Sequence, residues 1–252
     1  MSKPPSPDHT ERTRLHRVSV FVPAYNEAAN LEPAVRDIVR AAERTLADYE
    51  VIIVDDGSRD ATGQIADRLA EENDRIRAVH QPRNLGIAAA YERALDEAKL
   101  EHFSFLPGDG EIAPESIGDI FAAVGAADVV APYHGNSEAR QLHRRVLTWT
   151  STRLVNVLFG LRMRYFQGPC IYPTALARSL PKTAGGFYFL TEMLVHAARA
   201  GYRCVEVPLT HQERSHGKSK AVSARNLLRA LRAVATLWWS IHVQKVSFDR
   251  RS

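Results

Sequence analysis

Short apolar runs that end in polar turns recur along the chain. The runs Val18–Val22 and Val51–Val54 are rich in β-branched residues and stop abruptly at turn-forming residues and carboxylates. This pattern is typical of a buried parallel strand whose carboxyl end opens into a loop. We predict further strands at Ile76–His80, His102–Leu106, Asp128–Ala131 and Cys204–Pro208.

Helical periodicity separates these strands. Apolar residues three and four positions apart predict a helix from Leu31 to about Leu46, with Asn30 as its cap. Strands that alternate with helices of roughly 10 to 15 residues predict right-handed crossovers and an α/β fold with a mostly parallel sheet. The further helices are expected at Gly63–Glu72, Ile87–Ala98 and Leu190–Ala200.

The ends of the chain differ from this regular body. Residues 1–16 are polar and rich in proline, and we expect a disordered lead. Residues 17–220 are expected to form one domain, in which Tyr133–Arg164 is basic and helical. Residues 221–252 are expected to form an amphipathic helix, over Val222–Val243, and a tail.

Composition narrows the class of protein without deciding it. The 252 residues are 45% hydrophobic and 25% charged, with a net charge of +4, so we expect no nucleic-acid partner. Cys170 and Cys204 lack zinc-type spacing, and we expect reduced packing residues in a cytoplasmic protein. We recognise no signal peptide at the start of the chain and no run of about 18 or more apolar residues that would span a membrane.

Polar and aromatic residues follow the first two strands. Pro23, Tyr25 and Glu27 come after the first strand, and Asp55 and Asp56 come after the second. In open α/β sheets the ligand crevice lies beyond the carboxyl ends of the strands. These residues therefore predict one pocket, in which the tyrosine stacks on a base and the carboxylates bind base or sugar groups. The alternative is that the aspartates only cap the turn and the next helix.

Two later loops carry charge that suits a diphosphate. In Pro107-Gly-Asp-Gly-Glu111, the alternate residues Asp109 and Glu111 can face one hard cation, Mg²⁺ or Mn²⁺, which would hold a nucleotide diphosphate. The run Arg214-Ser-His-Gly-Lys-Ser-Lys220 places three cations around a glycine, as phosphate recognition requires. The alternatives are an acidic surface turn and a solvated basic loop.

Together these motifs carry a family resemblance. The runs V-S-V-F-V-P-A-Y-N-E, V-I-I-V-D-D-G-S-R-D-A-T, N-L-G-I-A-A-A-Y and R-S-H-G-K-S-K resemble the family 2 inverting glycosyltransferases of GT-A fold. Within that family, the chain is most similar to the dolichol-phosphate mannose synthase and polyprenyl-phosphate hexose synthase group. The resemblance extends from about Arg17 to Lys220, and the late R-x-x-G-x-S-K points to the polyprenyl-phosphate branch.

The resemblance assigns roles to individual positions. It implies a Mg²⁺ or Mn²⁺ cofactor held by Asp109 and Glu111, and catalytic roles for Asp109, Arg214 and Lys220. It also places Glu192 where the family often has an acidic residue facing the site. The implied nucleotide-binding positions are Pro23, Tyr25, Glu27, Val54, Asp56, Gly108 and His134.

Three departures from the family pattern leave the donor sugar open. Pro107 stands where the first aspartate of the metal motif is expected, so one carboxylate ligand is missing. His134 stands roughly where the synthases often have an arginine. Phe166-Gln-Gly-Pro-Cys-Ile-Tyr172 replaces the usual Asp-x-Thr-Ser-Gly-Phe-Arg stretch. The donor is therefore GDP-mannose or a UDP-sugar.

The implied reaction is a metal-dependent, inverting transfer of a hexose from that donor to a polyprenyl phosphate, dolichyl or undecaprenyl. An acceptor phosphate with a second pKa of about 6 is ionised at neutral pH and needs no strong general base. The nearest carboxylates are Asp109 and Glu192. Alternatives are a family 2 enzyme with a non-lipid acceptor and a catalytically silent nucleotide-binding protein.

The lipid acceptor implies a membrane surface. The last predicted helix has an apolar face with Trp238 and Trp239 beside a stripe of arginines, which favours an interfacial helix at the inner face of the membrane. The alternative is that this face packs on the catalytic domain. A membrane-protein partner stays open.

Overall fold

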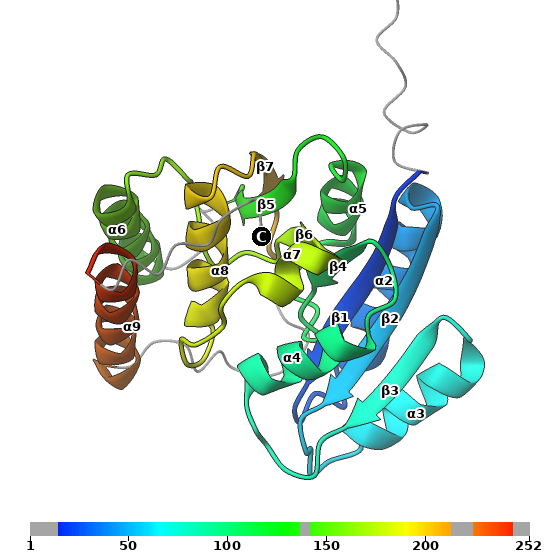
Figure 1. The fold of residues 1–252 in the computed structure, drawn as a ribbon. Helices are drawn as coiled ribbons and strands as arrows, with labels where there is room; N and C mark the ends of the chain where they lie inside the picture. Colours follow the sequence, from blue (N-terminus) through cyan, green and yellow to red (C-terminus); the bar gives the residue numbers. More distant parts are fainter. Residues whose placement is uncertain (1–14, 137–141, 213–223, 244–252) are drawn as a thin grey trace, which may run out of the picture.

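One sheet organises the part of the chain that the structure describes. A computed structural model describes residues 15–136, 142–212 and 224–243. In these ranges seven strands form a sheet in the order β3-β2-β1-β4-β6-β5-β7 (Figure 1). The strands are β1 Arg17–Ala24, β2 Asp48–Asp55, β3 Ile76–His80, β4 His102–Phe105, β5 Val129–His134, β6 Ile171–Pro173 and β7 Cys204–Leu209.

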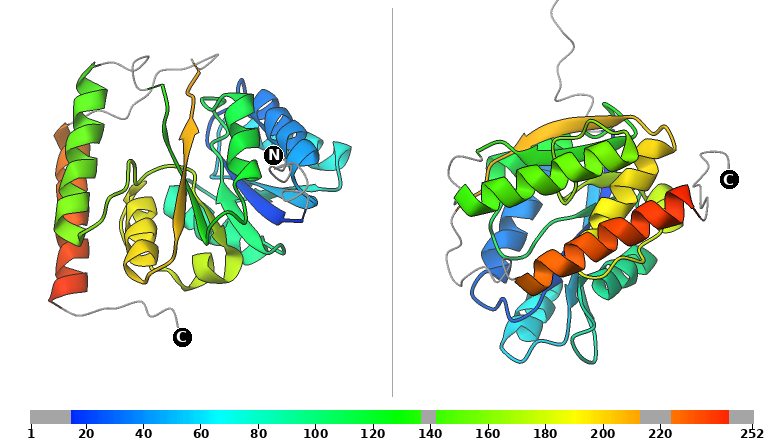
Figure 2. Two further views of the ribbon diagram at one scale, coloured as in Figure 1. Left: turned by 90° about the horizontal axis from the view of Figure 1, so that it is seen from above. Right: turned by 90° about the vertical axis from the view of Figure 1, so that its left-hand side faces the viewer.

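Helices cover both faces of the sheet, as Figures 1 and 2 show. One core lies between the sheet and α2, α3 and α5, and the other between the sheet and α4, α7 and α8. The helices α6 and α9 lie side by side beyond α8 and form an outer layer. The helices are α2 Leu31–Thr45, α3 Thr62–Glu72, α4 Ile87–Glu97, α5 Pro114–Ala122, α6 Leu142–Phe159, α7 Thr174–Ser179, α8 Tyr188–Arg199 and α9 Ala224–His242.

Strand direction places most loops of interest on one edge. β1 pairs in parallel with β2 and β4, β2 with β3, and β5 with β7. Only β6 among the described strands is antiparallel to its neighbours β4 and β5. The carboxyl ends of β1 to β5 and of β7 therefore share an edge, and the predicted mostly parallel α/β sheet is confirmed.

The apolar runs form strands because both faces of the sheet are buried. In β2, Val51 and Ile53 contact the core under α2 and α3, whereas Ile52 and Val54 contact the core under α4 and α8. All four side chains are fully buried. Because successive strand residues point to opposite faces, a central strand covered on both sides needs a continuous apolar run.

Several predicted boundaries change. Asn30 makes no side-chain cap on α2, so that prediction is wrong; its amide donates to the Glu27 carboxylate at 2.8 Å instead. The predicted helical segment Tyr133–Arg164 begins too early, because its first two residues end β5. α5, α7 and the antiparallel direction of β6 were not predicted from the sequence.

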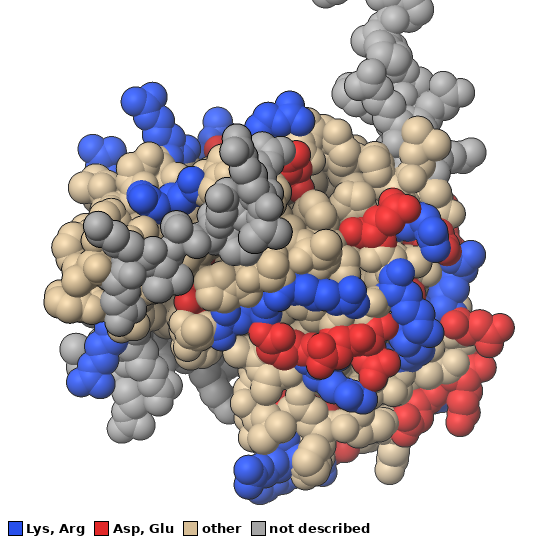
Figure 3. All heavy atoms as spheres, viewed as in Figure 1, with Lys and Arg blue, Asp and Glu red and all other residues tan. Residues whose placement is uncertain are grey.

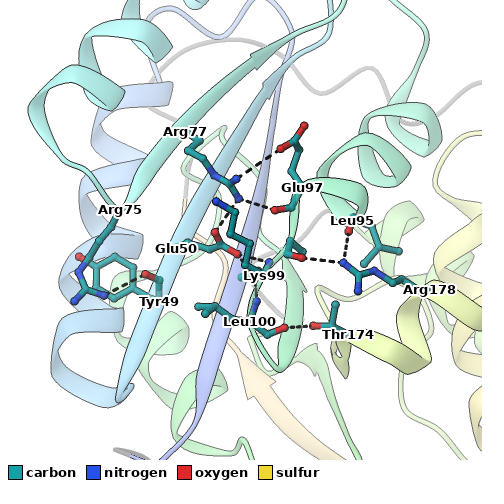
Figure 4. A network of polar contacts seen from close by, with 12 residues as sticks. Tyr49, Glu50, Arg75, Arg77, Leu95, Glu97, Lys99, Leu100, Thr174 and Arg178 are labelled. Carbon is teal, nitrogen blue, oxygen red and sulfur yellow. Dashed lines mark hydrogen bonds and ion pairs between the residues drawn. The ribbon is translucent and has the colours of Figure 1, made fainter.

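The opposite edge of the sheet is held by a network of polar contacts (Figure 4). Glu50 accepts hydrogen bonds from the Ser19 hydroxyl at 2.6 Å and from the Lys99 main-chain N–H at 2.7 Å. Arg77 donates to the Glu50 carboxylate at 2.8 Å and to the Glu97 carbonyl oxygen at 2.7 Å. This network joins β1, β2, β3 and the end of α4 far from the carboxyl ends of the strands.

The two cysteines are free and lie in or against the core, as predicted. Burial raises the pKa of the Cys170 thiol to about 12 and that of the Cys204 thiol to about 11. Both groups are therefore protonated and poorly reactive at neutral pH. Within the three described ranges, none of the helices has the length and apolar character needed to cross a membrane.

Candidate active site

The loop after β1 is tied to the loop after β2. The main-chain N–H of Asn26 donates to the Ser58 hydroxyl at 3.0 Å, and the Asn26 side chain accepts from the Arg59 N–H at 2.9 Å. The Glu27 N–H donates to the Thr62 hydroxyl at 2.8 Å. Asn26 has a φ of 55°, a left-handed conformation that asparagine tolerates better than most residues. The loop after β2 therefore fixes the shape of the loop after β1.

These contacts bring three predicted nucleotide-binding positions together. Pro23 lies opposite Val54 in the register of β1 and β2. A Cβ placed on Gly108 would lie 2.9 Å from the Pro23 carbonyl oxygen, so only glycine permits this close approach. Tyr25 is 43% exposed beside them, as stacking on a base would require. Nucleotide binding by these residues stays a prediction.

Asp56 anchors a third loop to the same edge. Its carboxylate accepts hydrogen bonds from the main-chain N–H groups of Leu85 at 2.7 Å and Gly86 at 2.9 Å. Its own N–H donates to the Ala24 carbonyl oxygen at 2.9 Å. The side chain thus holds the Asn-Leu-Gly turn at the start of α4. Each carboxylate oxygen can accept a further hydrogen bond, which leaves room for a base N–H. Contact with a base stays a prediction.

The acidic turn meets the end of β7. The Gln212 N–H donates to the Glu111 carbonyl oxygen and its side chain donates to the Gly110 carbonyl oxygen, both at 2.9 Å. Within the turn, the Glu111 N–H donates to the Asp109 carboxylate at 3.1 Å. The chain therefore enters the predicted phosphate loop directly beside the acidic turn. Arg214 and Lys220 themselves lie outside the described residues.

The acidic turn has the chemistry of a site for a hard cation. Asp109 and Glu111 supply carboxylate oxygens, which Mg²⁺ and Mn²⁺ prefer, and both are half-buried at the carboxyl edge. No cluster of three or more His, Cys, Asp or Glu side chains that would hold a metal occurs among the described residues. Cation binding by the two carboxylates stays a prediction, in which phosphate oxygens and water would complete the coordination, as they usually do at Mg²⁺ sites that hold phosphates.

His134 lies at the end of β5 and contacts the end of β7. Its Nδ1 lies 2.7 Å from Nε2 of His211, and its ring lies 4.2 Å from that of Tyr165. The Asn136 side chain fixes the main chain of His211. Its amide N–H donates to the His211 carbonyl oxygen at 2.9 Å, and its amide oxygen accepts from the His211 N–H at 3.0 Å. In the sheet, β4 and β6 separate His134 from β1, and its role in nucleotide binding stays a prediction. His211 and Asn136 were not predicted.

Glu192 anchors the loop before α8. Its carboxylate is 5% exposed and accepts hydrogen bonds from the Thr183 N–H at 2.7 Å, the Thr183 hydroxyl at 2.6 Å and the Ala184 N–H at 2.9 Å. These contacts engage both carboxyl oxygens in holding a loop. Glu192 is therefore a poor candidate for a general base, contrary to the suggestion from sequence.

The carboxyl edge of this α/β sheet thus gathers the turns that the sequence predicts to bind a nucleotide and its phosphates. Comparison with known families agrees. Residues 19–178 match the model of glycosyl transferase family 2, and the chain belongs to that family of sugar-transferring enzymes. The family resemblance read from the sequence is confirmed.

The chain is similar in sequence to several individual enzymes of known name. The chain is 31% identical to polyprenol monophosphomannose synthase of Mycolicibacterium smegmatis, over 89% of this chain and 87% of that protein. It is 28% identical to undecaprenyl-phosphate mannosyltransferase of Micrococcus luteus, over 81% of this chain and 87% of that protein. It is also 31% identical to glycosyltransferase AglD of Haloferax volcanii, but it spans only 38% of that longer protein.

Solved structures share the fold. Glucosyl-3-phosphoglycerate synthase of Mycobacterium tuberculosis, in complex with Mn²⁺, UDP-glucose and phosphoglyceric acid, superposes with a TM-score of 0.66 at 18% identity. The match covers 95% of this chain and 85% of that one. The same enzyme with Mg²⁺ and UDP gives a TM-score of 0.62 over 90% of this chain and 83% of that one. At this identity, the likeness shows the fold alone.

Proposed function

We propose that this family 2 glycosyltransferase moves a hexose from GDP-mannose or a UDP-sugar to a polyprenyl phosphate, with inversion and with Mg²⁺ or Mn²⁺ as cofactor. Two relatives that match more than four fifths of the chain are named for transfer to polyprenol or undecaprenyl phosphate. The structural observation that supports a diphosphate donor is the contact of the acidic turn with Gln212, two residues before the predicted phosphate loop.

In this proposal each loop has one task. Tyr25 stacks on the nucleobase, and Asp56 and Glu27 bind base or ribose groups beside Pro23, Val54 and Gly108. Asp109 and Glu111 hold the cation, which would neutralise charge on the departing nucleotide diphosphate. Arg214 and Lys220, which lie outside the described residues, would stabilise the same charge. His134 lies farther along the edge, where it would contact the acceptor or the sugar.

The acceptor supplies its own nucleophile. An ionised phosphate oxygen attacks the anomeric carbon from the face opposite the nucleotide, and the bond to the diphosphate breaks as the new bond forms. The electron pair of the broken bond leaves with the nucleotide diphosphate. Because the acceptor oxygen is already ionised, no proton has to be removed from it. This explains why an anchored Glu192 is compatible with transfer.

An exposed apolar surface on two helices supports the polyprenyl acceptor. Neither α6, with 18 residues, nor α9, with 19 residues, contains an aspartate or glutamate. In the coloured part of Figure 3, acidic side chains gather on the side of α2 and α3. We define the α6–α9 surface by its exposed apolar residues: Val146, Leu147, Trp149, Leu154, Val157, Trp238, Trp239 and Val243.

Basic and apolar side chains on one surface suit an anionic bilayer. Trp149 and Val157 are 66% and 70% exposed on α6, and Trp239 is 54% exposed on α9. The arginines Arg153 and Arg232 are exposed on the same two helices. We therefore place α6 beside α9 in the membrane-facing layer, which extends the sequence prediction for the last helix alone.

Part of the apolar face of α9 packs on the catalytic domain, which was the alternative interpretation of this helix. Leu237 is 5% exposed and belongs to the core, against which Val234 and Ile241 pack. Trp238 is 37% exposed and stacks on His242, with ring centroids 5.0 Å apart. One side of α9 is thus packed on the domain while another remains available to lipid.

A donor screen tests the proposed function. Purified protein is supplied with Mg²⁺ or Mn²⁺, a short polyprenyl phosphate and one labelled donor at a time: GDP-mannose, UDP-glucose, UDP-GlcNAc or UDP-galactose. We expect label from one donor to enter the organic phase. Label in water-soluble acceptors such as 3-phosphoglycerate would favour the non-lipid enzyme instead. Binding of donors without transfer would favour the silent protein, with Pro107 as its structural basis.

A further inference from the structure

An imidazole joins two carboxylates beside the predicted nucleotide site. Nδ1 of His80, at the end of β3, lies 3.2 Å from Oδ2 of Asp55, and Nε2 lies 2.8 Å from Oδ1 of Asp67 on α3. Asp55 is 6% exposed at the tip of β2. Gly63 leaves room for the contact, since a Cβ there would lie 2.9 Å from Oδ2 of Asp55 and 3.5 Å from the imidazole.

The contact continues to the loop that carries Tyr25. The other carboxylate oxygen of Asp55 accepts from the Ser58 N–H at 3.0 Å. The Ser58 hydroxyl in turn accepts from the Asn26 N–H at 3.0 Å. A continuous series of hydrogen bonds therefore runs from His80 through Asp55 and Ser58 to Asn26, the neighbour of Tyr25 in the chain.

We infer that His80 is a positioning residue of the nucleotide site, which holds the loop from Tyr25 to Ala28 in its binding shape through Asp55 and Ser58. The inference rests on the proposed function, in which this loop contacts the nucleotide. His80 itself is separated from Tyr25 by Asp55 and Ser58, so it acts through them. Asn26 needs such support because its left-handed φ is less favourable than an ordinary conformation.

The link depends on protonation. Only the imidazolium has two N–H donors, so only this form donates to both carboxylates at once. The hydrogen bond with Asp67, followed by that with Asp55, raises the pKa of His80 above its ordinary value of 6.5, although burial opposes the rise. These carboxylates, from α3 and β2, are the charged groups in contact with the ring; Arg68 of α3 turns away to Glu32.

The sign of the pH effect follows. A histidine whose pKa is raised in the folded protein stabilises the fold. This stabilisation is fully present below the pKa of the unfolded state and is lost as the pH rises through the pKa of the folded state. Above that pH the neutral ring keeps one hydrogen bond and releases the other. We therefore expect the loop to be held most firmly at pH 6 and to loosen towards pH 8.5.

Two measurements on the full chain test this inference. The first is an NMR titration of the His80 ring together with the Asn26 and Ser58 amides. The second is calorimetric binding of UDP and GDP, with Mg²⁺, between pH 6 and pH 8.5. The variants are His80→Gln, which cannot become a cation, and Asp67→Asn, which lowers the His80 pKa. His242→Gln, on the exposed end of α9, is the matched control.

For the wild type and His242→Gln, we expect nucleotide affinity to fall roughly threefold to tenfold as the pH rises from 6 to 8.5. The midpoint of this fall should coincide with the midpoint of the His80 titration. His80→Gln should bind as the wild type does at high pH, without that change, and Asp67→Asn should shift the midpoint to lower pH. The inference would be overturned if the pH dependence of nucleotide affinity in His80→Gln matched that of the wild type. It would also be overturned if the amide signals of Asn26 and Ser58 did not change as His80 titrates. Failure of both nucleotides to bind any variant would contradict the proposed function, and the NMR titration would still decide the link between His80 and Asn26.

Discussion

The main-chain N–H of Gln212 donates a hydrogen bond to the carbonyl oxygen of Glu111 at 2.9 Å. The bond joins the turn after β4 to the end of β7, and the Gln212 side chain adds a second bond to Gly110. These contacts place Gln212, two residues before the predicted phosphate loop, beside the acidic turn. Residues that are distant in the sequence thus reach one edge of the sheet.

Removal of the Asp109 charge should stop transfer. Asp109→Asn keeps the shape of the side chain but lacks the negative charge that the cation requires, so we expect at least about a hundredfold loss of activity. Label transfer and metal-dependent nucleotide binding measure the effect. Asp119→Asn, on the exposed side of α5, is the control. Full activity in Asp109→Asn would refute the metal assignment.

A methyl group on Gly108 should separate β1 from the acidic turn. In Gly108→Ala the new Cβ would meet the Pro23 carbonyl oxygen at 2.9 Å, and we expect a loss of about 1–3 kcal/mol in the free energy of unfolding and weaker donor binding. Urea unfolding and nucleotide titration measure both effects.

Gly118→Ala, in α5, is the matched control for that change. Nothing lies within 4 Å of its new Cβ, and alanine is the better helix former by about 0.5–1 kcal/mol. The control should therefore be slightly more stable and bind nucleotide normally. Equal effects of the two substitutions would show that the contact between Gly108 and Pro23 has no special role.

Loss of the Glu50 charge should destabilise the fold and leave the chemistry intact. Glu50→Gln weakens the contacts with Arg77, Ser19 and Lys99, and we expect a loss of about 1–3 kcal/mol, measured by urea unfolding (Figure 4). Transfer at a temperature where the variant is folded should match the wild type. The exposed ion pair of Arg40 offers a control, since Arg40→Gln should change stability by less than about 1 kcal/mol.

Charge on the α6–α9 surface should weaken membrane binding. Each buried apolar side chain contributes about 1.5–3 kcal/mol, so the double variant Trp149→Glu with Val157→Glu should lose at least about tenfold in affinity for vesicles that contain phosphatidylglycerol. Vesicle flotation measures this binding. Leu15→Glu alters an equally exposed apolar residue elsewhere. Unchanged flotation of the double variant, or equal loss in the control, would contradict the assignment of this surface.

The regular part of the fold could be predicted because its pattern is strong. Strands such as Val51–Val54 are covered on both faces, and burial on both faces leaves an uninterrupted apolar run. α5 and β6 were missed for physical reasons. α5 begins with Pro114 and has only nine residues, and β6 has three, so neither is long enough to show a period.

The site was predicted in part for the same reason. Carboxylates and turn residues mark the tips of strands in the sequence, and from them we predicted that Pro23, Asp56 and Asp109 contact a ligand. Contacts that depend on the arrangement of distant strands leave no such local signal. Nothing near His80 in the sequence indicates that it would meet Asp55 and Asp67, and Glu192 gave no sign that it would anchor Thr183.

The central claim is that the acceptor is a polyprenyl monophosphate. The most direct test compares transfer of labelled sugar to a polyprenyl phosphate with transfer to the corresponding polyprenol, under identical donor and metal conditions. We expect rapid transfer to the phosphate and none to the alcohol, because only the phosphate brings a nucleophile that is already ionised at neutral pH. Equal transfer to both acceptors, or transfer to the alcohol alone, would contradict it.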